Sequence, residues 1–167
     1  RRNPEDGTVE VDLSKRSEER IDRVIREKTP RSRGESLKTV LQDLNVFLQG
    51  WIGFFWIVTG ETAERRVRNL DAHIRRRLRA LLLKQWKRKR SIVHRLIKLG
   101  CKPKTAWKTA YDGRRGLWDL SRRAAVQRTL RNAYFAKRGL FSIEGWWRDR
   151  WHRANAPVQL DLGLTLG

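Results

Sequence analysis

The stretch LKTVLQDLNVFLQGWIGFFWIV, residues 37–58, decides the fold of this chain. At the helical repeat of about 100° per residue, its large apolar side chains fall on one wide stripe. A helix with so broad an apolar face is stable only when that face is buried, so the stretch predicts a helix packed against other helices. The stripe consists of Leu37, Val40, Leu41, Leu44, Phe47, Leu48, Trp51, Ile52, Phe55 and Val58.

The sequence around this stretch predicts a mainly α chain that begins with a three-helix unit. Ser14 and Ser36 are suitable N-caps for the first two helices, because a serine hydroxyl accepts a hydrogen bond from a backbone N–H of the first turn. Thr29-Pro30 ends the first helix, since proline disfavours helical backbone in the residue before it. We expect helices over residues 15–28, 37–58 and about 62–89, forming one unit at 14–90.

Shorter helices are expected to form a smaller, basic helical domain over residues 91–153. Gly100 and Gly139 are placed to end helices, because glycine readily adopts the left-handed conformation found after helix C-termini. Ser121 and Ser142 are expected N-caps. The predicted helices cover 91–99, about 103–111, about 122–138, and a last segment that bears Trp146, Trp147 and Trp151.

The two ends of the chain fall outside these helices. Val9, Val11 and Leu13 alternate with acidic residues, which predicts a short N-terminal strand over residues 8–13, the end of a preceding region. Residues 154–167 have no clear period and are expected to form a flexible or extended tail. The 167 residues contain no methionine, even at position 1, so we expect the chain to be a piece of a longer protein.

The tryptophans mostly follow the apolar stripes of the predicted helices. Trp51, Trp86 and Trp118 are therefore expected in the core. Trp146 and Trp147 are adjacent, so only one of them can face a core fully, and the other is expected to meet nucleic acid or another domain.

Positive charge is concentrated in the middle of the chain. The whole chain has a formal net charge of +21, but residues 65–138 alone hold 25 Lys or Arg against 3 Asp or Glu, a net charge of +22. This excess cannot be neutralised internally and predicts a polyanionic partner. Arg75, Arg76 and Arg79 are expected to project away from the apolar stripe of the third helix, with Arg77 toward its flank. The residues predicted to contact phosphates are Arg75, Arg76, Arg77, Arg79, Lys84, Lys87, Arg88, Lys89, Arg90, Arg114 and Arg115.

Several functional classes find no support in the sequence. The single cysteine, Cys101, excludes an internal disulfide and fits a reducing compartment. The location expected for the chain is cytoplasmic and of prokaryotic type, with association with the nucleoid as an alternative. No apolar run reaches the roughly 18 residues that a membrane span needs, so no membrane partner is expected. The sequence also lacks the spacings of a Cys/His metal site and of a phosphate-binding loop.

The segment LNVFLQGWIGFF, residues 44–55, resembles the signature helix of group II intron reverse transcriptases with maturase function. The pattern of that family reads roughly L-N-P-x-L-R-G-W-x-N-Y-F. The resemblance covers most of residues 14 to 151, and the ordered set of motifs is more specific than any one of them. The further motifs are DAHIRRRLR at 71–79, KQWK at 84–87, GLWDLS at 116–121 and RNAYF at 131–135.

This resemblance implies that residues 14–90 are the thumb of a reverse transcriptase and that the chain is the C-terminal part of an RNA-directed DNA polymerase. The implied partners are RNA, either intron or template, together with DNA and the rest of the same polymerase. No Tyr-x-Asp-Asp motif occurs here, so the catalytic carboxylates and their Mg²⁺ are expected in a palm upstream of Arg1. The segment itself is expected to hold no catalytic residue and no cofactor.

The face opposite the apolar stripe of residues 37–58 carries small and amide side chains. Each glycine inside a helix costs about 1 kcal/mol relative to alanine, which suggests that something approaches the backbone closely there. One interpretation is close packing against another helix. The other is a smooth track in the minor groove of a template–primer duplex, where glutamine can donate to the groove acceptors. The residues of this glycine face are Gln42, Gln49, Gly50 and Gly53.

Three alternatives remain open from the sequence. Val46, Gln49 and Gly53 stand where the family pattern has Pro, Arg and Asn, which keeps open a related reverse transcriptase recruited to DNA repair, phage defence or CRISPR spacer acquisition. The second alternative is a stand-alone RNA-binding protein without a polymerase. The third is action on anionic membranes, which requires apolar faces left free in the monomer.

Overall fold

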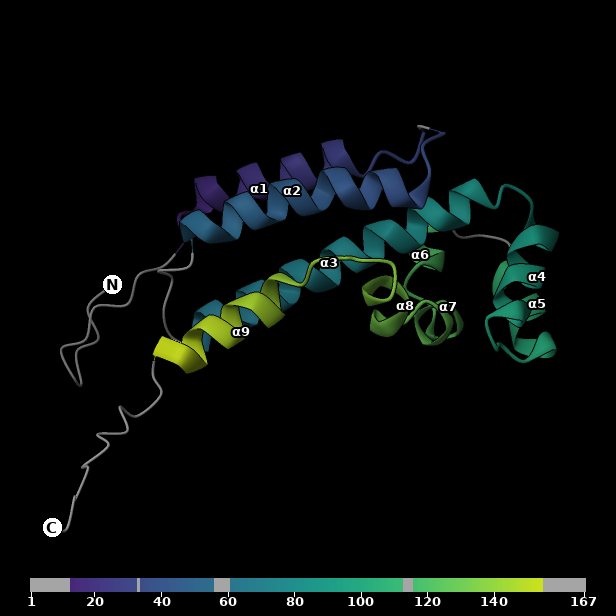
Figure 1. Cartoon of the computed structure of the whole chain (residues 1–167). Coiled ribbons are helices and arrows are strands. Elements are labelled where there is room, and N and C mark those ends of the chain that lie inside the picture. The colour runs from purple at the N-terminus through teal and green to yellow at the C-terminus, as the bar shows by residue number, and fades with distance from the viewer. Residues whose placement is uncertain (1–12, 33, 56–60, 113–115, 155–167) are drawn as a thin grey trace, which may run out of the picture.

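The computed structural model describes residues 13–32, 34–55, 61–112 and 116–154 of the chain (Figure 1). This described part consists of nine helices and contains no strand, which confirms the prediction of a mainly α fold. The predicted strand over 8–13 lies outside the described residues except for Leu13, and so does the predicted tail beyond Ala154.

Three long helices form the framework. The first two begin where the sequence predicts, because the hydroxyl of Ser14 accepts from the N–H of Ser17 at 3.2 Å and that of Ser36 accepts from the N–H of Thr39 at 3.2 Å. The first two helices lie side by side, and the third runs beneath them (Figure 1). They are α1 (Lys15–Lys28), α2 (Leu37–Phe55) and α3 (Glu61–Gln85).

The core lies between the facing sides of these helices. Ile25 of α1, Leu44 and Leu48 of α2 and Leu78 of α3 are each 0% exposed. Burying one such side chain fully contributes about 1.5–3 kcal/mol, so the predicted stripe of α2 contributes substantially to the stability of the fold. Trp51 packs against this core but stays half-buried, in contrast to the predicted central position.

The end of α3 and the basic run that follows differ from the prediction. The helix ends at Gln85, and Lys87 adopts a left-handed φ of 58°. A longer α3 would stack Lys84, Lys87 and Arg88 as like-charged neighbours on one face, which is unfavourable. The chain turns at residues 86–88 and continues into α4 (Lys89–Lys98), which packs against α5 (Pro103–Ala110).

Gly100 and Gly139 both adopt the expected conformation, with φ values of 94° and 85°, and each follows a helix C-terminus. The predicted helix over 122–138, however, is wrong. It is broken at Leu130, whose side chain is fully buried and whose carbonyl accepts a hydrogen bond from Nε of Arg79 at 2.9 Å. In its place are the short helices α7 (Ala124–Thr129) and α8 (Asn132–Ala136).

Ser121 does not cap a helix as predicted. It follows the short helix α6 (Leu117–Leu120), and its hydroxyl donates to the carbonyl of Trp118 at 2.6 Å. The N-cap position of α7 is occupied by Arg123 instead. Helix α6 packs against α3, so this region forms a second layer on the side of α3 away from α1 and α2 (Figure 1).

The last helix, α9 (Ile143–Ala154), returns along α3 and also contacts α2 (Figure 1). Ser142 caps it as predicted, since its hydroxyl accepts from the N–H of Gly145 at 3.0 Å. Trp147 is buried whereas Trp146 is only partly buried, as expected for adjacent tryptophans. The sequence did not predict that α9 joins the first three helices, and the domain boundary at residue 90 stays a prediction.

Candidate nucleic-acid interface

The arginines at the centre of α3 are anchored within the protein. Arg79, predicted to project away from the apolar stripe and to contact phosphate, is buried: its side chain is 8% exposed and donates to the buried carbonyl of Leu130. Burial lowers the pKa of Arg79 to about 10, and nearby Arg75 adds to the effect. Arg79 therefore holds the break between α7 and α8 against α3.

Arg77 closes the C-terminus of α1. Its Nε donates to the hydroxyl of Thr29 at 2.5 Å, and one terminal nitrogen donates to the carbonyls of Thr29 at 3.1 Å and Arg26 at 3.3 Å. The last carbonyls of a helix lack partners within that helix, and a cation there also interacts favourably with the helix dipole. Arg77 thus links α1 to α3.

Arg75 and Arg76 also contact protein groups. The guanidinium carbon of Arg76 lies 3.7 Å from the centroid of the Trp118 ring, and Arg75 lies 3.6 Å from a carboxylate oxygen of Asp71. A phosphate role for the four arginines stays a prediction. Their positions differ from expectation because the prediction considered only the three-helix unit, whereas α6–α9 cover the opposite side of α3.

Lys84 and the basic run at residues 87–90 are exposed. No salt bridge to Lys84 or to the run 87–90 is present in the described part of the chain. The sequence explains this, because no Asp or Glu occurs between Asp71 and Asp112. We call the exposed cations around the end of α3, α4 and α5 the basic end: Lys84, Lys87, Arg88, Lys89, Arg90, Lys98, Lys102, Lys104 and Lys108.

Two adjacent hollows open beside the basic end, between the loop after α1 and the last turn of α3. Both are lined by Arg31, Ser32 and Lys84, and one of them extends to Lys87. Gln85 borders that hollow and donates to the backbone carbonyl of Glu35 at 2.6 Å, which fixes the loop against α3. The lining of that hollow includes the cations Arg31, Lys84 and Lys87 and the hydroxyls of Ser32 and Ser36, groups that suit a phosphate, against one acidic residue, Glu35. The predicted residues Arg114 and Arg115 lie outside the described residues.

The glycine face of α2 is open. Gln42, Gln49, Gly50 and Gly53 are all exposed, and a Cβ added to either glycine would meet no atom within 4 Å. Among the described residues, no helix packs against this face, so the helix-packing interpretation finds no partner there. Val46, on the same face, is 74% exposed.

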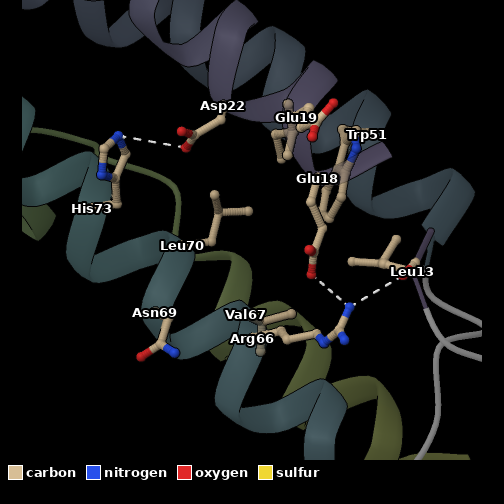
Figure 2. Close-up of a pocket in the computed structure, with 11 residues that line it drawn as sticks. Leu13, Glu18, Glu19, Asp22, Trp51, Arg66, Val67, Asn69, Leu70 and His73 are labelled. Carbon is tan, nitrogen blue, oxygen red and sulfur yellow. Dashed lines mark hydrogen bonds and ion pairs between the residues drawn. The ribbon is translucent and has the colours of Figure 1, made fainter. Parts of the chain in front are cut away.

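A separate hollow of about 380 Å³ lies between α1, α2 and α3 (Figure 2). Figure 2 shows Arg66 of α3 pointing toward Glu18, whose carboxylate it contacts at 2.5 Å, and His73 facing Asp22 at 3.6 Å. Burial is the main cause that lowers the pKa of His73. The acidic side chains of α1 at its rim make this hollow unsuited to a phosphate.

Two further properties concern the described residues alone. They contain no group of three or more His, Cys, Asp or Glu side chains placed to hold a metal ion. None of their helices combines the length and apolar character required to cross a membrane.

Comparison with known proteins finds one family model that matches part of the chain. Residues 19–99 match the family model of the group II intron maturase-specific domain, and this segment runs from α1 to the end of α4. No curated protein matches the chain. The family match indicates a maturase-type role with RNA as a partner. The resemblance found in the sequence is thereby confirmed: over residues 19–99 the chain carries a match to the group II intron maturase-specific domain family.

Proposed function

We propose that the chain is the nucleic-acid-binding C-terminal part of a group II intron-type reverse transcriptase, and that it grips structured intron RNA and the template–primer duplex. The observation that carries this proposal is the position of the basic end. Its cations begin inside the matched segment 19–99, at the end of α3, and continue onto α5. A maturase-type helical framework thus presents a cationic surface whose members form no salt bridge with an acidic residue in the described part of the chain.

Such a surface binds RNA or DNA mainly through phosphates. Each neutralised phosphate releases condensed counterions, which supplies most of the affinity and little sequence specificity. The hollows beside Lys84 would receive one phosphate, with Arg31 opposite. Contacts of this kind position a nucleic acid on the protein rather than read its bases.

The glycine face of α2 would contact a duplex at a second place. Its exposure leaves room for a sugar–phosphate wall beside Gly50 and Gly53, and the amides of Gln42 and Gln49 can donate to minor-groove acceptors. The basic end and the glycine face would then contact different parts of one bound nucleic acid. The rest of the polymerase would supply the catalytic site.

Lysine-reactivity footprinting tests the location of the interface. The purified chain is treated with a lysine-specific reagent in the presence and absence of structured intron RNA, and modification is measured by mass spectrometry. We expect RNA to protect Lys84, Lys87 and Lys104. The exposed residue Lys15, at the start of α1, is the internal control and should stay reactive. Protection of Lys15 equal to that of the three lysines of the basic end would contradict the proposal.

A further inference from the structure

Two aromatic rings stand exposed on α5. Trp107 is 43% exposed and Tyr111, which directly follows the helix, is 44% exposed. Their rings stack on each other, with centroids 5.1 Å apart and an angle of 26° between the planes. The ammonium of Lys89 lies 5.3 Å from the centroid of the Tyr111 ring. The pair is thus a preformed aromatic surface with a cation beside it.

The spacing of residues on α5 places cations on the same face as these rings. Lys104, Trp107, Lys108 and Tyr111 follow the i, i+3, i+4, i+7 pattern of a single helix face. In a globular protein that pattern usually marks the buried side of a helix. Here the packed side is formed by alanines instead, since Ala106 is 0% exposed. The aromatic face therefore points outward and is not explained by the packing of the described residues.

The surrounding charge identifies the chemistry of a partner. Lys102, Lys104 and Lys108 are exposed, and no acidic residue occurs from 72 to 111. An aromatic surface with adjoining cations suits single-stranded nucleic acid, in which bases stack on the rings and phosphates meet the cations. A continuous duplex offers only its backbone here, because its base faces are occupied by neighbouring bases.

We propose that Trp107 and Tyr111 form a stacking platform for an unpaired base of single-stranded RNA or DNA, and that Lys104 and Lys108 hold the neighbouring phosphates. The platform lies beyond the segment that matches the maturase-specific domain. This inference rests on the proposed function, which assigns the basic end to nucleic acid, and it adds unpaired nucleotides as a class of ligand.

The test compares single strands with a duplex. Affinities of the full chain are measured by fluorescence anisotropy for oligouridylate, oligothymidylate and a blunt duplex of the same length. The double variant Trp107→Ala/Tyr111→Ala should bind single strands about 5- to 150-fold more weakly for each stacked base lost. Its affinity for the duplex should stay close to that of the parent. The effects on the two strands show whether the platform accepts RNA, DNA or both.

Two further variants separate stacking from charge and from folding. Trp107→Phe/Tyr111→Phe keeps two rings and should retain most of the single-strand affinity. Lys104→Gln/Lys108→Gln removes charge without removing a ring, so it should weaken strand and duplex binding alike. Circular dichroism spectra should match the parent for all variants, since the substituted side chains are exposed.

The outcomes distinguish the two proposals. If the parent binds neither strand nor duplex, the proposed function fails and the platform fails with it. If the parent binds both but the alanine variant loses equal affinity for each, only the platform is overturned. Unchanged strand affinity in the alanine variant also overturns the platform.

Discussion

Asp71 of α3 fastens the beginning of α9 to the framework. Its carboxylate accepts from the hydroxyl of Ser142 at 2.7 Å, from the N–H of Ile143 at 3.1 Å and from that of Glu144 at 3.3 Å. A carboxylate at a helix N-terminus satisfies backbone donors that have no partner within the helix and interacts favourably with the dipole. A single side chain thus performs a capping role across a separation of more than 70 residues.

Removing this contact should loosen α9. We expect Asp71→Ala to lower the free energy of unfolding by about 1–3 kcal/mol, because it leaves a buried N–H without a partner. Asp71→Asn keeps an acceptor for Ile143 and should cost less. Thermal melting of both variants checks this, and an equal, negligible shift for the two would remove Asp71 from the attachment of α9.

The same residue makes stability depend on pH. Burial raises the pKa of Asp71 above its ordinary value of 3.8, despite the hydrogen bonds and Arg75 that favour the ionised form. The unfolded chain therefore releases this proton first, and stability contributed by Asp71 falls as pH rises from about 3.8 through the raised value. Asp71→Asn should abolish this part of the pH dependence. Urea unfolding of parent and variant across this range measures it, and a difference that grows in the opposite direction contradicts it.

Arg79 should matter for folding rather than for binding alone. Arg79→Ala leaves the buried carbonyl of Leu130 without its donor, so we expect a loss of about 1–3 kcal/mol in the free energy of unfolding. Arg90→Ala is the matched control, because Arg90 is exposed and such surface changes stay within about 0.5 kcal/mol. Chemical denaturation distinguishes the two. Equal effects would mean that the contact between Arg79 and Leu130 contributes nothing.

At the scale of the element, substitutions on the glycine face of α2 should raise the stability of the protein and lower its affinity for a duplex. Gly50→Ala and Gly53→Ala add a methyl group in open space and improve helix propensity, so each should raise the free energy of unfolding by up to about 1 kcal/mol. If the face receives a duplex, the same variants should bind template–primer more weakly. Melting curves and duplex titrations on one protein preparation test both parts. Reduced stability would show that another part of the protein already covers the face.

The helices that the sequence predicted well are those whose signals are local. The bounds of α1 and the N-terminus of α2 follow from Ser14, Ser36 and a continuous apolar stripe, which act within a few residues of one another. The break at Leu130 was missed because a distant donor, Arg79, takes its carbonyl. The role of Asp71 was missed for the same reason, since nothing near it in the sequence identifies α9 as its partner.

The same contrast between local and distant signals applies to the residues of the candidate site. Exposure of Lys84 and of the run 87–90 could be predicted from charge, because the sequence offers no acid nearby. The burial of the α3 arginines could not be predicted from the sequence, because it depends on the second layer of helices that covers them. The exposed ring pair on α5 was also missed. Its helical spacing imitates a buried stripe, and only the lysines interleaved with the rings indicate an outward face.

On the scale of the whole molecule, the arginines that stabilise the fold and the cations proposed to bind nucleic acid lie in different parts of the chain. Arginines in the middle of α3 join the two layers, whereas the cations of the basic end form no salt bridge within the described part of the chain. The helical framework from α1 to α3, closed by α9, thereby holds the basic end at one end of an elongated molecule (Figure 1). This separation is why binding can be altered there without disturbing the core.

The most direct test of phosphate binding by the basic end is the salt dependence of RNA affinity. For six to ten phosphate contacts, affinity for structured RNA should fall about a thousandfold or more between 50 and 200 mM salt. The triple variant Lys84→Gln/Lys87→Gln/Arg90→Gln should flatten the log–log slope by about 2–3 units. The matched control Arg16→Gln/Arg20→Gln/Arg23→Gln, on the exposed face of α1, should leave the slope near that of the parent. Equal slopes for parent and triple variant, or equal flattening in both variants, would contradict the claim that the basic end binds phosphates.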